Sequence, residues 1–590
     1  MNDGVFASLL NINPGVFVMA AGLLALLARG TLQRGIVLIG GPVVALLALL
    51  ARPGDAEAVT STLFGYELVL YHVDSLNRVF GLAFLIAAGL AGIYSLHRED
   101  RIQDASAMVY AGAAIAAAFV GDFLSLFVFW ELTAVASVFL IFARGTKAAY
   151  AAGMRYLAIQ VLSGVMLLGG AALYGSHTGS MLLPEFNPKE AITALDLNDP
   201  GVMLIFIAFG IKAAFPLLHN WLQDSYPNAT ETGSVVLSAF TTKLAVYALA
   251  RCFAGTDSLI YIGAIMTVFP VFFAVIENDL RKVLAYSLNN QVGFMVCAVG
   301  VGTELAINGA AAHAFAHIMY KALLFMSMGA VMLRVGTTKA TELGGLYRTM
   351  PLTTVFCLIG AASISAFPLF SGFVAKSLTM SAIGYEHLTL VWAMLLFASA
   401  GVLEHSGIKI PYFAFFSHDS GKRPQEAPFN MLIAMGGAAA LCIIVGVAPA
   451  WLYTLLPYRE KAMEYLANDL WTVDHVLTQM QLLVLAAFAF VLLKRLGLYP
   501  AEKRGVVLDF DWTYRKLGYG FALWTGRVWT RLGPAITEIW RGLAARIFRQ
   551  LTAAFSPEGE LSRGALSGSM AVWTAIVLGL VLVVTAVFPT

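Results

Sequence analysis

Seven ionisable residues stand inside long apolar stretches of this sequence, where a charge is costly. A charged side chain near the centre of a bilayer costs at least ~2.5 kcal/mol on insertion scales. Carboxyl, amine and imidazole groups share one chemistry, which is the uptake and release of a proton. The seven are therefore candidate proton-transfer residues: Glu131, Lys212, Lys243, His313, His317, Lys321 and Lys376.

Glu131 and Lys212 suggest a switchable charge pair. Glu131 lies in the middle of an apolar run, and Lys212 stands just before the sequence Ala214-Phe215-Pro216. Burial favours the neutral form of a lysine, whereas a nearby carboxylate favours the charged form. A pair whose separation changes could therefore take up and release a proton. The alternative is a structural ion pair that ties two helices together.

His313, His317 and Lys321 follow one another at intervals of four residues, so a helix would place them on one face. Two histidines four residues apart could instead bind a metal or a haem. No acidic or cysteine partner lies nearby in the sequence, so we predict a proton relay, no metal and no cofactor. For Lys243 the alternatives are proton relay, structural pairing or snorkelling toward the membrane surface.

Several other polar residues receive weaker assignments. Glu404 and Lys409 lie in a later apolar run and form a second tier of candidates. Asp122 stands at the head of the run that contains Glu131, where it is expected to cap a helix. Arg155, Arg251 and Lys282 are interpreted as topology signals near the cytoplasmic ends of spans.

The composition indicates a protein that crosses the membrane many times. Of the 590 residues, 59% are hydrophobic and 12% are charged, against about 45–50% and 25% in soluble domains. This excludes a cytosolic enzyme, a secreted disulfide scaffold and a disordered chain. Lysine and arginine total 37 and acidic residues 35, a net charge of +2 that gives no case for nucleic acid binding. The four cysteines show neither metal-site nor disulfide spacing.

The apolar runs predict about sixteen helical spans, because membrane-crossing helices need about 20 residues. They cover residues 13–29, 34–51, 77–96, 106–121, 123–143, 153–175, 200–219, 233–253, 258–277, 283–301, 306–334, 352–383, 389–416, 428–450, 476–495 and 568–588. Alternate connections carry the basic residues, as the positive-inside rule requires. This predicts an inner (plasma) membrane protein with both termini on the non-cytoplasmic side. No signal peptide cleavage is expected after Met1.

A four-residue repeat divides the chain. Ala214-Phe215-Pro216-Leu217 recurs as Ala366-Phe367-Pro368-Leu369, each inside an apolar span that a proline must break. Paired broken helices crossing in opposite directions are typical of inverted-repeat transporters. The predicted domains are N-terminal helices, two inverted repeats, C-terminal core helices, an amphipathic segment along the cytoplasmic face and a final span: 1–105, 106–253, 258–416, 417–495, 496–567 and 568–588.

These motifs together resemble the proton-translocating antiporter-like family, which includes the large membrane subunits of respiratory complex I and Mrp-type antiporter subunits. The resemblance covers about residues 70–416 and is carried by Trp130-Glu131, Lys212 to Leu222, Ser238 to Leu249, Asp279 to Ser287, His313 to Lys321 and Phe367 to Lys376. The stretch Leu508 to Arg515 is most similar to D-type Mrp subunits. Gln223, Thr230 and Ala366 depart from the family pattern, which usually has proline, proline and glycine there.

The resemblance implies an all-α core of fourteen transmembrane helices with two inverted five-helix repeats, and a central row from Glu131 and Lys212 to Lys376. It also implies membrane partner subunits and exchange of H⁺ with a monovalent cation, expected to be Na⁺. A proton-pumping subunit of a complex I-like dehydrogenase or membrane hydrogenase is one alternative. A proton-coupled module of inorganic-carbon uptake is another, and a membrane enzyme fits poorly.

Overall fold

The fold was determined as a computed structural model, which describes residues 10–53, 56–189, 194–500, 503, 505, 507–554 and 567–587. The chain divides into two compact units, Met1–Val507 and Leu508–Thr590, and each is described here by itself. The predicted N-terminal residues Met1 to Leu9 and residues 555–566 of the predicted amphipathic segment lie outside the described residues.

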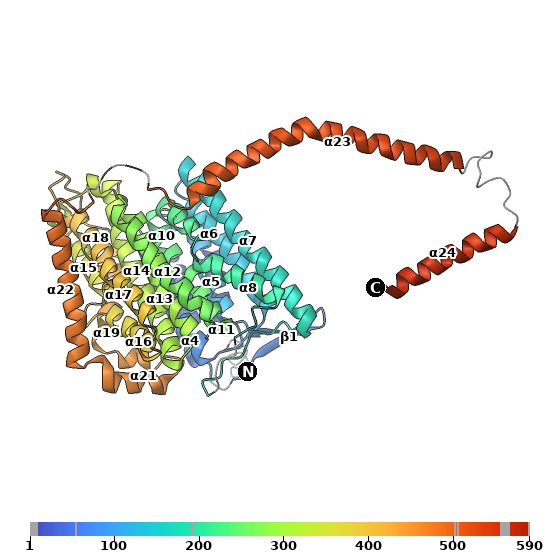
Figure 1. The fold of residues 1–590 in the computed structure, drawn as a ribbon. Coiled ribbons are helices and arrows are strands. Elements are labelled where there is room, and N and C mark those ends of the chain that lie inside the picture. Colours follow the sequence, from blue (N-terminus) through green and yellow to red (C-terminus); the bar gives the residue numbers. More distant parts are fainter. Residues whose placement is uncertain are drawn as a thin grey trace. The chain divides into compact units, whose positions relative to one another are not determined.

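The first unit is a helical bundle (Figure 1). Its α-helices and strands are α2 (Pro14–Ala25), α3 (Gly30–Ala51), β1 (Val59–Leu63), β2 (Tyr66–Tyr71), α4 (Ser75–Ser95), α5 (Arg101–Phe119), α6 (Phe123–Phe142), α7 (Lys147–Thr178), α8 (Pro200–Ala213), α9 (Asn220–Ser225), α10 (Glu231–Ala239), α11 (Thr241–Cys252), α12 (Asp257–Ile276), α13 (Leu280–Val301), α14 (Glu304–Val335), α15 (Pro351–Ile364), α16 (Ser371–Tyr385), α17 (Thr389–Val402), α18 (Lys409–Pro411), α19 (Phe429–Val447), α20 (Ala450–Tyr453), α21 (Arg459–Tyr465) and α22 (Val473–Arg495). Short 3₁₀ or π turns are η1 (Tyr226–Asn228), η2 (Ala340–Glu342), η3 (Leu346–Arg348), η4 (Leu403–Ile408), η5 (Tyr412–Phe416) and η6 (Leu466–Leu470).

Twelve helices in the described part of the chain are long and apolar enough to cross a membrane, and four shorter apolar helices accompany them. The sixteen predicted spans fall on these helices. Two of the shorter ones, α8 and α15, are the first parts of spans that the structure interrupts. The chain is therefore a multi-pass membrane protein. Helix α14 lies at the centre, because residues 305–331 are all buried.

The two Ala-Phe-Pro-Leu repeats end their helices in the same way. Phe215 N–H donates to Gly210 O (2.9 Å) and Phe367 N–H to Ala362 O (3.0 Å), each reaching back five residues. Ala214 (φ 64°) and Ala366 (φ 57°) take the left-handed conformation. This is the Schellman arrangement that commonly ends a helix, with alanine where glycine is usual.

A tight turn then follows at each repeat. Leu217 (φ 70°) and Leu369 (φ 72°) also have left-handed backbones, and each follows a proline. Proline at the second position and a positive φ at the third define a type II turn. The prediction of two broken helices is confirmed, and the repeated sequence adopts one repeated conformation because each residue has a defined place in these turns.

Basic connections meet at one end of the bundle. Arg144 donates to Pro227 O (2.7 Å), and Arg281 donates to Ala229 O and Thr230 O (3.0 Å each). At the opposite end Arg251 forms an ion pair with Asp74 (2.6 Å). The interpretation of Arg251 as lying near the same ends as Arg155 and Lys282 was therefore wrong: helix α11 runs away from the basic connections and carries Arg251 to its far end.

One short β-hairpin lies outside the predicted all-helical pattern. Strands β1 and β2 pair in antiparallel fashion, and Phe64 (φ 53°) and Gly65 (φ 83°) form the connecting turn. Positive φ angles at both central residues suit a two-residue hairpin turn. The pattern of apolar runs carried no signal here, because the segment between α3 and α4 is short and half exposed.

The second unit consists of the π-helical turn η7 (Thr513–Gly518) and two helices, α23 (Tyr519–Ala554) and α24 (Ser567–Val587). Helix α23 is 36 residues long and amphipathic, as the sequence predicted for this segment. Its place along a membrane face stays a prediction. Helix α24 falls on the predicted final span of residues 568–588, and its crossing of the membrane also stays a prediction.

Candidate proton-transfer site

Helix α6 places Glu131 against helix α7. The Glu131 side chain is half-buried, and its Oε1 has no hydrogen-bond partner among the described residues. Gly164 of α7 lies directly beside this carboxylate, and a β-carbon there would overlap it. The carboxylate therefore occupies a slot that exists only because residue 164 has no side chain.

Lys212 is completely buried near the end of α8, and it contacts neutral acceptors next to Glu131. Its Nζ donates to Trp130 O (2.5 Å) and Thr133 Oγ1 (2.8 Å). The ammonium also lies 4.3 Å from the centre of the Trp130 ring, a cation–π contact. Lys212 and Glu131 interact electrostatically. The predicted partners are thus neighbours, and in this conformation the lysine is bonded to a carbonyl and a hydroxyl.

Hydroxyl side chains, called the hydroxyl chain below, are spaced between Lys212 and Lys243. Thr133 and Ser137 are four residues apart on α6 and share a face. Ser137 Oγ lies 2.8 Å from Tyr156 OH, which also interacts with Thr241. Thr241 Oγ1 lies 2.6 Å from Tyr110 OH. These residues were not predicted from the sequence, because isolated hydroxyls in apolar helices carry no spacing signal.

Lys243 lies at the junction of α10 and α11. Thr241 N–H donates to Tyr110 OH (3.0 Å) in place of a helical carbonyl, so the helix is interrupted there. Lys243 is fully buried, and its Nζ donates to Ser238 O (2.6 Å) near this interruption. Lys243 therefore stands at a helix break, as Lys212 does.

His313, His317 and Lys321 line one face of the central helix α14, as predicted, and all three are fully buried. His313 Nε2 lies 2.9 Å from Tyr320 OH and 3.2 Å from Gln291 Oε1. Neither ring nitrogen of His317 nor Lys321 Nζ has a hydrogen-bond partner among the residues described. Such polar atoms suit contact with water, which the two rings, with centroids 6.2 Å apart, would need to exchange protons.

Lys376 follows the second helix break on α16. Its Nζ donates to Ile364 O (2.8 Å), the last residue of α15, and lies 5.2 Å from the centre of the Phe294 ring. Phe294 in turn contacts the His313 ring, at 5.8 Å between centroids. Lys376 is therefore anchored to the broken helix and separated from the histidines by one aromatic ring.

The structure adds His405 to this row. His405 is fully buried in the π-helical turn η4, a feature often found at functional sites. Its Nδ1 lies 2.8 Å from Ser406 Oγ, and its Nε2 has no partner among the described residues. Its electrostatic neighbours are Lys321, Lys409 and Lys376. A histidine four residues before Lys409 was the sequence signal that could have identified it.

The second-tier residues take different positions. Lys409 Nζ donates to three carbonyls at the end of α12, those of Ala274, Val275 and Glu277, at 2.6–3.2 Å. This satisfies carbonyls that a helix end leaves without partners, so Lys409 has a structural role. Glu404 is half-buried beside His405. Asp122 caps α6 as predicted, accepting from Ser125 N–H (2.7 Å).

Electrostatic interactions link several of these residues across different helices. Lys243 acts on His313, His317 and Lys321, and Lys321 acts on His405. Lys376 interacts electrostatically with all four of these residues: His313, His317, Lys321 and His405. Glu131 and Lys212 form a separate pair, and hydroxyl side chains lie between this pair and the start of α11.

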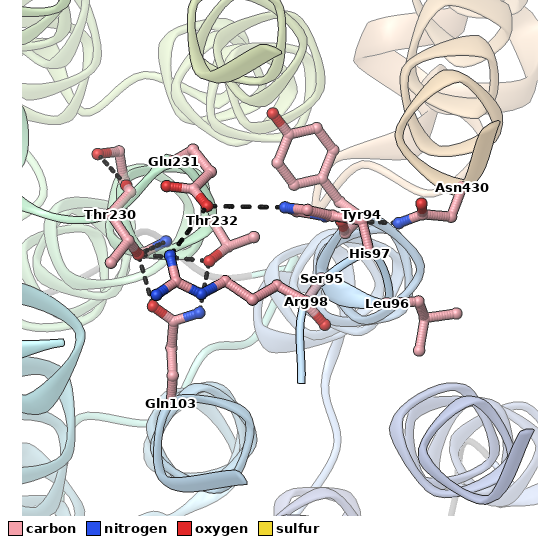
Figure 2. Close-up of polar contacts among 12 residues, drawn as sticks. Tyr94, Ser95, Leu96, His97, Arg98, Gln103, Thr230, Glu231, Thr232 and Asn430 are labelled. Carbon is pink, nitrogen blue, oxygen red and sulfur yellow. Dashed lines mark hydrogen bonds and ion pairs between the residues drawn. The ribbon is translucent and has the colours of Figure 1, made fainter. Parts of the chain in front are cut away.

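A polar cluster lies where α10 begins, at the end of the bundle that carries the basic connections. Figure 2 shows its side chains and their contacts. Glu231 Oε1 lies 3.6 Å from His97 Nε2 and 3.9 Å from Arg98 Nη1. Gln103 donates to Thr232 Oγ1 and accepts from Thr230 Oγ1, both at 2.6 Å. Thr230 also caps α10 by accepting from Gly233 N–H (2.9 Å), which explains a threonine where the family pattern has proline.

Comparison with known proteins assigns the chain to one family. The family described as "NADH:quinone oxidoreductase/Mrp antiporter, TM" matches residues 120–403. The D-type subunit of the Na(+)/H(+) antiporter of Alkalihalophilus pseudofirmus is 31% identical over 355 residues, which cover 57% of this chain and 71% of that protein. The chain belongs to this family.

Relatives within the family serve in different complexes. Hydrogenase-4 component B of Escherichia coli is 27% identical over 430 residues, covering 66% of this chain and 64% of that protein. The fold matches a chain of the Mrp complex from Dietzia (TM-score 0.68, 20% identity, 79% of this chain and 99% of that one). It also matches a chain of the membrane-bound sulfane sulfur reductase (TM-score 0.67, 20% identity, 97% and 99%). The chain is thus an antiporter-like membrane subunit of the Mrp, complex I and hydrogenase family.

Proposed function

We propose that this chain is the proton-translocating subunit of a multi-subunit monovalent cation/proton antiporter, with Na⁺ as the expected cation. The observation that carries the proposal is the row of buried, basic side chains from Lys212 to Lys376, several without hydrogen-bond partners in the part of the chain that the structure describes. Burying so many cationic groups is costly. A purely structural role gives no reason to bury His317 and Lys321 without hydrogen-bond partners among the described residues.

The Glu131–Lys212 pair supplies the switch in this proposal. Lys212 alternates between its present acceptors, Trp130 O and Thr133 Oγ1, and the Glu131 carboxylate beside them. Near the carboxylate the charged lysine is favoured, and away from it the neutral form is favoured, because a low-polarity environment opposes an isolated charge. Each change of position therefore takes up or releases one proton, which the hydroxyl chain passes toward Lys243.

We infer the orientation of the protein in the membrane from its basic connections. Arg98, Arg144 and Arg281 lie at one end of the bundle, where they contact residues of the same segment, 227–231. The positive-inside rule assigns this end to the cytoplasm. We infer that the cluster of Glu231 and His97 faces the cytoplasm and that α16 and the start of α22 face the opposite side.

Cation/proton exchange in inside-out vesicles from cells that express the whole complex tests the proposal. Glu131→Gln and Lys212→Ala are compared with wild type, and Glu185→Gln, an exposed loop carboxylate, is the matched control. We expect exchange to fall by about tenfold or more in the first two, a barrier increase of about 1.4 kcal/mol per factor of ten, and to persist in the control. Unchanged exchange in both site variants would refute the switch.

A redox-driven proton pump is the second candidate, because the match to Hydrogenase-4 component B extends over 430 residues. In that case the row would be driven by a partner enzyme rather than by a cation gradient. Wild-type vesicles would then show no Na⁺-dependent exchange, and the purified complex would contain redox subunits. The same Glu131 and Lys212 variants would lower redox-driven proton transport.

A further inference from the structure

A cavity of about 370 Å³ lies beside Lys376 at the second helix break. Its walls come from α16, α17 and the peripheral helix α22. Besides Lys376, the polar side chains among the lining residues include Ser377, Ser381, Ser399, His475, Thr478 and Gln479. A volume of this size has room for on the order of ten waters, at about 30 Å³ each. The cavity therefore gives buried Lys376 a compartment large enough for water.

The lining residues point to protons rather than metal cations. Lys376 and His475 belong to the lining, and no carboxylate is among the described residues that line the cavity. Hard cations such as Na⁺ need several oxygen ligands and favour negative charge, whereas an ammonium beside the cavity repels them. A lysine and a histidine facing one water-sized space are instead suited to exchange a proton through water.

His475 is held in an orientation that leaves one ring nitrogen available. Ser377 Oγ donates its proton to Phe373 O (2.7 Å), so His475 Nε2, 3.2 Å from the same oxygen, must be the donor in their contact. The neutral ring then carries its lone pair on Nδ1. The ring also packs on Phe373, 5.1 Å between centroids. These contacts fix the tautomer that can accept a proton at Nδ1.

Helix α22 is tied to the helix break at this point. Gln479, one turn after His475, donates to Ala366 O (3.1 Å). Ala366 is the left-handed residue that ends the second broken helix. The equivalent Ala214 O at the first break accepts instead from Asn289 of α13 (2.8 Å). Only the second break is thus capped from a peripheral helix that also brings a histidine.

We propose that this cavity is the terminal compartment of the proton path and that His475 is the last side chain to accept the proton. The proposal rests on the function proposed above. Lys376 gives up one N–H proton from its ammonium and becomes a neutral amine. Water in the cavity transfers the proton to His475 Nδ1, and the resulting imidazolium releases it to the solution at the end of the bundle opposite the basic connections. No electron changes hands.

The first experiment separates proton acceptance from packing. His475→Gln keeps a donor toward Ser377 but cannot be protonated, and His475→Ala leaves space for added imidazole. In proteoliposomes that contain the whole complex we expect proton transport to fall by at least about fivefold in both, and imidazole to restore the alanine variant only. Gln481→Ala, an exposed position on α22, is the control. Normal transport in His475→Gln, or no rescue of His475→Ala, would overturn the proposal.

The second experiment asks whether water reaches the cavity. All four native cysteines, Cys252, Cys297, Cys357 and Cys442, are buried, so a Ser381→Cys variant provides one accessible thiol within the unit. We expect a membrane-impermeant, negatively charged thiol reagent to label it from the outside of right-side-out vesicles. Absence of labelling, which a lipid tail or a partner subunit in the cavity would cause, would overturn the proposal.

Failure of this inference is distinguishable from failure of the proposed function. If Glu131→Gln and Lys376→Met abolish transport while His475→Gln transports normally, the buried row stands and the terminal role of His475 is wrong. If the wild-type complex moves no protons under either driving force, the proposed function itself is wrong.

Discussion

The Glu131 carboxylate of α6 lies where the β-carbon of any side chain at residue 164 of α7 would be, and residue 164 is a glycine. The glycine is helical and has an ordinary backbone conformation, so its role here is close approach rather than turn formation. The position of the carboxylate relative to Lys212 is therefore set by a residue on a third helix.

Gly164→Ala should impair transport although it leaves every ionisable residue in place. The added methyl displaces the carboxylate from its slot, and overpacking of this kind costs about 1–3 kcal/mol. We expect exchange to fall toward the level of Glu131→Gln. Gly169→Ala is the control, because a β-carbon at residue 169 of the same helix meets no atom within 4 Å. Equal activity of the two variants in vesicles would show that the slot is irrelevant.

Tyr156→Phe should interrupt the hydroxyl chain between Lys212 and Lys243. The variant leaves Ser137 and Thr241 without the hydroxyl that contacts both, and an unmet buried hydrogen bond costs about 1–3 kcal/mol. The expected result is slower proton transport with cation binding preserved. Tyr150→Phe, at an exposed site on α7, should transport normally. Transport assays on both variants in the assembled complex test this prediction, and equal transport rates would contradict it.

Ala366 should tolerate glycine and reject valine. Its φ of 57° lies in the left-handed region, which costs non-glycine residues about 1–2 kcal/mol and β-branched residues more. Ala366→Gly is expected to keep transport and thermal stability, whereas Ala366→Val should lower the melting temperature of the purified complex. Ala362→Val, one turn earlier within α15, serves as the helical comparison. A stable, active Ala366→Val protein would contradict the assigned conformation.

The Asp74 carboxyl should make the stability of the folded protein depend on pH in the acidic range. Burial by itself raises the pKa of the Asp74 carboxyl, but the Arg251 guanidinium and His72 outweigh burial and hold that pKa well below its usual range. A carboxyl with a lowered folded-state pKa stabilises the protein above its unfolded pKa of about 3.9, and this contribution is lost as the pH falls below that value.

Asp74→Asn should therefore destabilise the protein near neutral pH, by about 3–5 kcal/mol if buried Arg251 is left unpaired. The difference in melting temperature between wild type and variant should shrink as the pH falls below about 4. Asp257→Asn, an exposed first-turn carboxylate on α12, is the control. A difference that stays constant from pH 7 to pH 3.5 would exclude the Asp74–Arg251 pair as its source.

Much of the fold could be predicted because membrane insertion imposes simple rules on sequence. Apolar runs of sufficient length located the spans, and the prolines at positions 216 and 368 located both breaks. The β-hairpin between α3 and α4 was missed, because its strands are short and carry no apolar run. Arg144 and Arg281, which were predicted to share one side, meet at one end of the bundle, whereas Arg251, predicted for the same side, lies at the opposite end.

The sequence by itself determined which residues are costly to bury: Glu131, Lys212, Lys243, Lys321 and Lys376 stand out because an ionisable group in an apolar run has no local explanation. Only the tertiary structure decided what each of them contacts. Lys212 binds a carbonyl and a hydroxyl of α6, Lys409 binds the end of α12, and His405 joins the row, all through partners distant in sequence. The free-energy cost of burying an ionisable group depends on that residue and its neighbours in the sequence. The atoms that it contacts depend on how helices distant in the sequence pack together.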